Sequence, residues 1–122
     1  MVKRFRTKPV EIKAIQWTGD NLKDVQDFVG SRKVDENWTI INFQLAGTYG
    51  LWIHDDGSAM REITGEVFDT LHHSWIGVKT GQWIVRGVKG EVYPCDDETF
   101  HWKYEEVITE NQYANGHPYD RT

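Results

Sequence analysis

Residues 9–17 alternate between apolar and polar side chains, and this period of two predicts a strand. Because successive side chains of a strand point to opposite faces, the segment has two distinct faces. One face holds two charged residues together with Ile15 and Trp17. The other face is mostly apolar, and we expect it to pack on the core; its members are Val10, Ile12, Ala14 and Gln16. Gln16 then needs hydrogen-bond partners for its amide.

The next apolar residues recur at helical spacing. Leu22, Val25, Phe28 and Val29 would share one side of a short helix. Gly30 predicts its end, because glycine adopts the left-handed conformation that closes many helices. We expect Asp20 or Asn21 to cap the first turn through its side chain.

The remaining pattern predicts mostly strands. Apolar runs separated by turn residues cover 38–45, 51–53, 66–71, 75–79, 82–86, 91–93 and 103–108. His72-His73-Ser74 predicts the loop of one hairpin, and Gly87-Val88-Lys89-Gly90 that of another. Pro94 is expected to end its strand, and Asp96 to begin a short helix that runs through Trp102.

These elements predict one α+β domain over residues 1–109, followed by a polar C-terminal tail over 110–122. The expected architecture is a single, mostly antiparallel, curled sheet or a small half-open barrel. One helix lies early in the chain and a short one late. A chain of 122 residues is close to the commonest size of a single domain.

Charge and composition exclude several classes of protein. The chain has 14 basic and 19 acidic residues, a net charge of −5, which argues against nonspecific nucleic-acid binding. The basic cluster from Lys3 to Lys8 is interpreted as a solvated terminus. One cysteine cannot form an internal disulfide. Neither a membrane-spanning run nor a signal-peptide pattern is seen, so we expect a cytoplasmic location without membrane contact.

No motif for metal binding or catalysis stands out. The five histidines are not arranged as HExxH or HxxxH, and no CxxC is present, so neither a metal nor another cofactor is expected. Acidic neighbours disfavour a thiolate at Cys95, which is interpreted as a packed structural thiol. The acidic pairs Asp55/Asp56 and Asp96/Asp97 are interpreted as turn and cap residues. We therefore predict no catalytic residue.

Aromatic side chains are the most distinctive feature, with six tryptophans in 122 residues. We expect most of these rings to fill the core. The alternative is a pocket of rings, amides and cations that binds a planar ligand. Its candidate residues are Gln16, Trp17, Trp75, Trp83, Arg86, Lys89 and Tyr93. Phe100, Trp102 and Tyr104 extend the aromatic series along the chain.

Two segments resemble a family of small bacteriophage and prophage proteins: Lys8-Pro9-Val10-Glu11-Ile12 continued by Ile15-Gln16-Trp17-Thr18-Gly19, and the stretch from Gly81-Gln82-Trp83 through Gly87-Val88-Lys89-Gly90 to Tyr93-Pro94-Cys95. The region from Glu66 to Val78 is similar to versions in phages of actinobacteria, especially mycobacteria. The resemblance covers roughly residues 3–107. The chain departs from the pattern at Gln82, often acidic in such proteins, and at Asp96-Asp97, often Lys-Pro.

The resemblance implies a phage accessory protein that acts in the host cytoplasm but supplies no catalytic residue. We expect a non-catalytic binding module that captures a host protein or a small nucleotide-like ligand. One alternative is a small hydrolase or nucleotide-modifying enzyme that uses His72 or His101 with a nearby carboxylate. Another is a structural virion or assembly protein. Homo-oligomerisation is left open.

Overall fold

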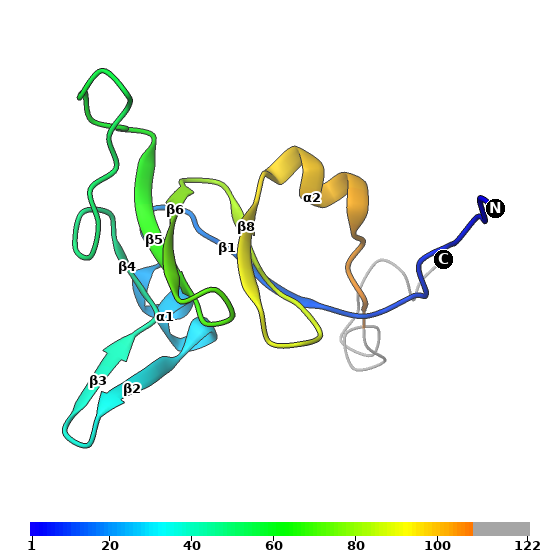
Figure 1. Cartoon of the computed structure of the whole chain (residues 1–122), viewed down its shortest axis with the longest axis horizontal. Coiled ribbons are helices and arrows are strands. Elements are labelled where there is room, and N and C mark those ends of the chain that lie inside the picture. The colour runs from blue at the N-terminus through cyan, green and yellow to red at the C-terminus, as the bar shows by residue number, and fades with distance from the viewer. Residues whose placement is uncertain (109–122) are drawn as a thin grey trace, which may run out of the picture.

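Residues 1–108 are the part of the chain described by the computed structural model, and they contain two helices and eight strands (Figure 1). The elements are β1 (Lys13–Gln16), α1 (Leu22–Val29), β2 (Ser31–Asp35), β3 (Trp38–Ile41), β4 (Phe43–Leu45), β5 (Ile63–Asp69), β6 (Ser74–Lys79), β7 (Trp83–Arg86), β8 (Val92–Cys95) and α2 (Asp97–Lys103). All strand pairs are antiparallel and form three sheets: β1-β7-β8, β2-β3 and β4-β5-β6. The predicted α+β class is confirmed, and none of these sheets closes into a barrel.

The core lies where α1 meets the β1-β7-β8 and β4-β5-β6 sheets. Its fully buried members include Trp17, Phe43 and Ile84. The Trp17 ring meets the edge of Phe43 at 4.9 Å between centroids, and its Nε1 donates a hydrogen bond to Thr64 Oγ1 over 2.9 Å. Gly65 permits this packing, because a Cβ there would lie 2.5 Å from Phe43 Cζ.

The face predicted to cover the core at the start of the chain is wrong. Strand β1 begins only at Lys13, and Val10 before it is 66% exposed. Ile15 packs against the core and Trp17, just after the strand, is fully buried. The pairing of β1 with β7 therefore turns the Ile15 side inward, which the short alternating pattern could not reveal.

The predicted helix α1 is confirmed, including its end at Gly30 with φ of 75°. Val25 and Val29 are its buried residues. The predicted side-chain cap is wrong. Asn21 Oδ1 instead accepts from the Thr18 backbone N–H, and Asn21 Nδ2 donates to the Gln16 carbonyl. The Asn21 amide thus closes the turn between β1 and α1.

Both predicted hairpins are confirmed. Strands β5 and β6 pair with Val67 opposite Ile76, and β7 and β8 pair with Arg86 opposite Val92. Strand β8 continues through Pro94 to Cys95, contrary to the expected stop. Strand β8 lies at the edge of its sheet, where proline is tolerated because half of the backbone N–H groups face no neighbouring strand.

Other boundaries differ from the prediction. The expected strand over 38–45 is broken at the buried Asn42, whose backbone N–H donates to the Gly30 carbonyl. Strand β2 was not predicted, and Ile53 forms only an isolated bridge with Ala59. The predicted strand over 103–108 is wrong, since Lys103 ends α2 and no strand follows it within the described range. The predicted tail over 110–122 lies outside the described residues.

Candidate functional site

A stack of aromatic rings joins α2 to the β1-β7-β8 sheet. Trp83 of β7 and Phe100 of α2 lie face to face, 4.2 Å apart and within 4° of parallel. His101 meets both rings edge-on, at 5.7 Å and 5.6 Å. Offset and edge-on ring pairs each add stabilisation beyond the area they bury. The stack therefore positions a helix that has no buried residue of its own.

Asp97 is the polar centre of the same site. Its Oδ1 accepts hydrogen bonds from Trp83 Nε1 at 2.8 Å and Gln16 Nε2 at 3.4 Å. His101 Nε2 lies 3.1 Å from this oxygen. Residues three and four apart share one face of a helix, so Asp97, Phe100 and His101 meet the sheet together.

Two more contacts join the sheet to residues just before and just after α2. The side chain of Gln82 donates to Asp96 Oδ1 at 2.8 Å. On the far side of the stack, the hydroxyls of Tyr93 and Tyr104 lie 3.2 Å apart. The hydrogen bond with Tyr104, together with partial burial, raises the pKa of Tyr93 from 10.0 to about 12.

This raised pKa predicts a loss of α2 docking at alkaline pH. The neutral Tyr93 is favoured in the folded protein, so its contribution is complete below pH 10 and is lost as pH rises through about 12. We expect the near-ultraviolet circular dichroism of the Trp83 stack to weaken within that window. The Tyr93→Phe variant should lack this step. A transition of equal size in the variant would assign it to another group.

The outer side of α2 presents an exposed tryptophan, which shares its helix face with Glu98 four residues earlier. Trp102 is 86% exposed, and Asp96, Asp97 and Glu98 are exposed around the start of α2. We call this region the α2 surface, and it consists of Trp83, Asp96, Asp97, Glu98, Phe100, His101 and Trp102. It combines aromatic rings with negative charge, and Lys103 ends the same helix.

The structure brings only part of the predicted ligand-binding set together. Gln16 and Trp83 meet at Asp97. Tyr93 reaches the stack indirectly, through the hydroxyl of Tyr104, whose ring lies 5.1 Å from that of Phe100. Trp17 lies in the core without exposed surface. Trp75 lies on another sheet, where it stacks on Tyr49 at 4.4 Å.

The two predicted cations also lie apart from the α2 surface. Arg86 follows Trp83 by three residues on β7 and therefore points to the opposite face. Its guanidinium donates to the Phe28 carbonyl and lies 4.7 Å from the Phe28 ring. Lys89 is exposed in the Gly87–Gly90 turn, where its backbone N–H donates to Glu91 Oε2.

Sequence reasoning missed the central role of Asp97 and the contact of Gln82. Both acids at 96–97 were interpreted as cap residues, yet neither makes a side-chain cap hydrogen bond to α2. The available signal was the spacing of Asp97, Phe100 and His101 on a short helix. Most of the aromatic rings were expected to fill the core, but of the six tryptophans only Trp17 is buried, while Trp52, Trp75 and Trp83 are half-buried.

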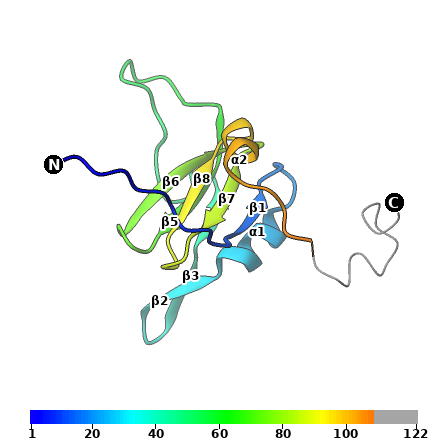
Figure 2. The same ribbon diagram turned by 90° about the vertical axis from the view of Figure 1, so that its right-hand side faces the viewer.

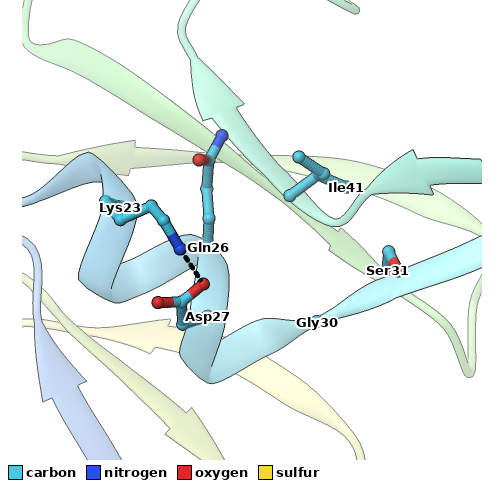
Figure 3. Close-up of a pocket in the computed structure, with 6 residues that line it drawn as sticks. All are labelled: Lys23, Gln26, Asp27, Gly30, Ser31 and Ile41. Carbon is cyan, nitrogen blue, oxygen red and sulfur yellow. Dashed lines mark hydrogen bonds and ion pairs between the residues drawn. The ribbon is translucent and has the colours of Figure 1, made fainter.

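Two hollows lie away from the α2 surface. One of about 400 Å³ adjoins the turn from Asp35 to Trp38. The other, of about 300 Å³, lies between α1 and the base of β2 and β3 (Figure 3). Its wall includes the Lys23–Asp27 ion pair and Ile41 but no aromatic ring. Neither hollow matches the aromatic pocket that the sequence analysis gave as the alternative to an aromatic core.

Histidine–carboxylate pairs occur at three places in the described part of the chain. His72 Nδ1 contacts Asp69 Oδ2, His101 pairs with Asp97, and His54 Nε2 lies 3.8 Å from Glu62 Oε1. Burial alone would raise the pKa of Asp69, but hydrogen bonds from His72 and Leu71 lower it below its usual value. The side chains of His72 and His101 are largely exposed, at 76% and 62%.

Within residues 1–108, no group of three or more His, Cys, Asp or Glu side chains is placed to hold a metal ion. Cys95 is buried at the end of β8, as expected for a packed thiol. Neither α1 nor α2 is long and apolar enough to cross a bilayer. Comparison of the chain with protein-family models, curated proteins and solved structures finds no match.

Proposed function

We propose that this protein is a non-catalytic phage accessory module that captures a host protein through the α2 surface. The observation that carries this proposal is Trp102, 86% exposed on a helix that buries none of its residues. Tryptophan is enriched among residues that dominate the energy of protein interfaces. A side chain of this size left in water is available to a partner without any change in the fold.

Charge favours a protein over a nucleotide as the captured ligand. Glu98 shares the helix face of the exposed Trp102, and Asp96 and Asp97 lie at the start of the same helix, so these negative charges oppose the phosphates of a nucleotide. Arg86 and Lys89, the cations expected to balance such phosphates, lie elsewhere. The carboxylates fit a partner segment that presents Lys or Arg beside an apolar side chain, with each arginine able to form paired hydrogen bonds to a carboxylate.

The test is affinity capture with matched variants. The immobilised full chain is exposed to extract from an actinobacterial host, and retained proteins are quantified by mass spectrometry. We expect one host protein at fixed stoichiometry with the wild type, and a loss of at least about tenfold with Trp102→Ala. Val88→Ala is the control, because Val88 is similarly exposed, at 67%, in the β7–β8 turn.

Salt provides a second readout of the same contact. Raising ionic strength screens exposed charges, so retention of the host protein should weaken as salt increases. Equal retention by the wild type and Trp102→Ala contradicts the proposal. A nucleotide found bound to the purified chain by native mass spectrometry would instead favour the small-ligand alternative.

The enzyme alternative rests on one observation, the 3.1 Å contact between His101 and Asp97 beside the Trp83 ring. A carboxylate can orient a histidine that acts as a general base. If this alternative holds, purified protein should hydrolyse a member of a nucleotide or ester panel, and His101→Ala should abolish that turnover. The virion alternative stays a prediction, checked by whether the protein is present in purified particles.

A further inference from the structure

Strands β2 and β3 form a two-stranded ribbon that projects from the rest of the fold, away from α2 (Figures 1 and 2). Its base is held by Arg32, whose guanidinium lies 3.4 Å from the centre of the Phe68 ring and donates to Asn42 Oδ1. Towards its tip, Trp38 is 62% exposed. Within residues 1–108 each of the two strands pairs only with the other. Each therefore offers one unpaired backbone edge.

The two edges differ in charge and regularity. Strand β2 carries Arg32, Lys33 and Asp35, and its register shifts between Lys33 and Asp35. Charged side chains and bulges are the devices by which proteins protect an edge from pairing. Strand β3 has the sequence Trp-Thr-Ile-Ile, without charge, proline or glycine. Its edge is thus the one suited to accept another strand.

We propose that β3 pairs antiparallel with β3 of a second copy of this chain, so that two ribbons join into a four-stranded sheet. An uncharged strand can lie against itself without like-charge repulsion, whereas β2 cannot. A two-fold axis perpendicular to the sheet relates the two copies.

Symmetry restricts the register of this pairing. Residues opposite one another in an antiparallel pair have side chains on the same side of the sheet. A residue of β3 can therefore lie opposite the same residue of the second copy, or opposite one an even number of positions away along β3. Centring the pair on Thr39 places it opposite Thr39 of the second copy, and Trp38 opposite Ile40. Threonine pairs and aromatic–β-branched pairs are both favourable across strands. Trp38 and Ile40 share one face, so the two copies bring four apolar side chains together there.

The contact is short, so the dimer is expected to be concentration-dependent. We expect native mass spectrometry and light scattering of the full chain to show a species of twice the 14.3 kDa monomer as concentration rises. The proposal is independent of capture by α2, because Trp102→Ala should leave the dimer unchanged.

Charge at the symmetry axis tests the register. Thr39→Lys and Thr39→Glu each place like charges opposite one another and should each weaken the dimer by at least about tenfold. An equimolar mixture of the two variants should restore it as a heterodimer. Val34→Lys is the matched control on β2, where Val34 is exposed at the register shift, and it should dimerise like the wild type.

Thermal unfolding of dilute samples checks that the exposed Thr39 tolerates each substitution. Three outcomes would overturn the proposal. These are a wild type that stays monomeric at every concentration, a mixture that fails to recover the dimer, and a Val34→Lys variant that weakens the dimer as strongly as Thr39→Lys.

Discussion

Replacing Trp17 by alanine is expected to lower the free energy of unfolding by about 3–5 kcal/mol. The side chain is fully buried, in edge contact with Phe43, so its removal opens a cavity between α1 and two sheets. The substitution also deprives Thr64 Oγ1 of its hydrogen-bond donor. Thr64 keeps a partner in Thr80, whose hydroxyl lies 2.8 Å away, so the cavity is the larger part of the loss.

Urea unfolding followed by far-ultraviolet circular dichroism measures this change, since helix and sheet are lost together in a small cooperative domain. Trp102→Ala is the control, because it removes the same side chain from an exposed position. We expect the control to stay within about 0.5 kcal/mol of the wild type. A loss below about 1 kcal/mol for Trp17→Ala would mean that the Trp17 ring is not the centre of the core.

Replacing Glu66 by leucine should release the loop between β4 and β5 and destabilise the fold by about 2–5 kcal/mol. Glu66 is fully buried on β5. Its carboxylate accepts from Trp52 Nε1 at 2.8 Å and from the backbone N–H of Tyr49. Leucine keeps the apolar stem but removes the acceptor for both donors, and an orphaned buried donor costs more than a typical hydrogen bond contributes.

Two variants separate the hydrogen bonds from the volume of the side chain. Glu66→Gln keeps one acceptor oxygen and should lose less stability than Glu66→Leu. Glu62→Leu changes a half-exposed carboxylate and should have little effect. Cleavage by trypsin after Arg61 reports on the loop directly, and we expect it to accelerate in Glu66→Leu alone. Unchanged cleavage in that variant would show that other contacts hold the loop.

Glycine also decides how this loop packs against the sheet. A Cβ at Gly77 of β6 would lie 2.9 Å from Ile63 Cγ2 and 3.2 Å from Trp52 Cε3. The absence of a side chain there gives the Trp52 indole access to the sheet next to Glu66. The half-buried Trp52 thus packs over the buried Glu66 outside the main core, and neither alternation nor hydropathy along the sequence indicated this contact.

The local pattern alone determined the parts of this protein that neighbours in sequence control. Helix α1 follows from the spacing of Leu22, Val25 and Val29 and ends at Gly30, and the β7–β8 hairpin follows from two apolar runs around a glycine-rich turn. The antiparallel α+β class followed from these elements. In each case the residues that decide the structure lie close together along the sequence.

Only the tertiary structure decided which faces are buried and which side chains meet. Trp17 enters the core and Val10 does not because β1 pairs with β7, a strand some 70 residues later in the chain. Asp97 becomes the centre of the α2 surface because Gln16 and Trp83 reach it from two different strands. Such contacts depend on strand register and helix placement, and a shift of one residue exchanges the two faces of a strand. That is the physical reason why the sequence named Gln16, Trp83 and Tyr93 as candidates but could not bring them together.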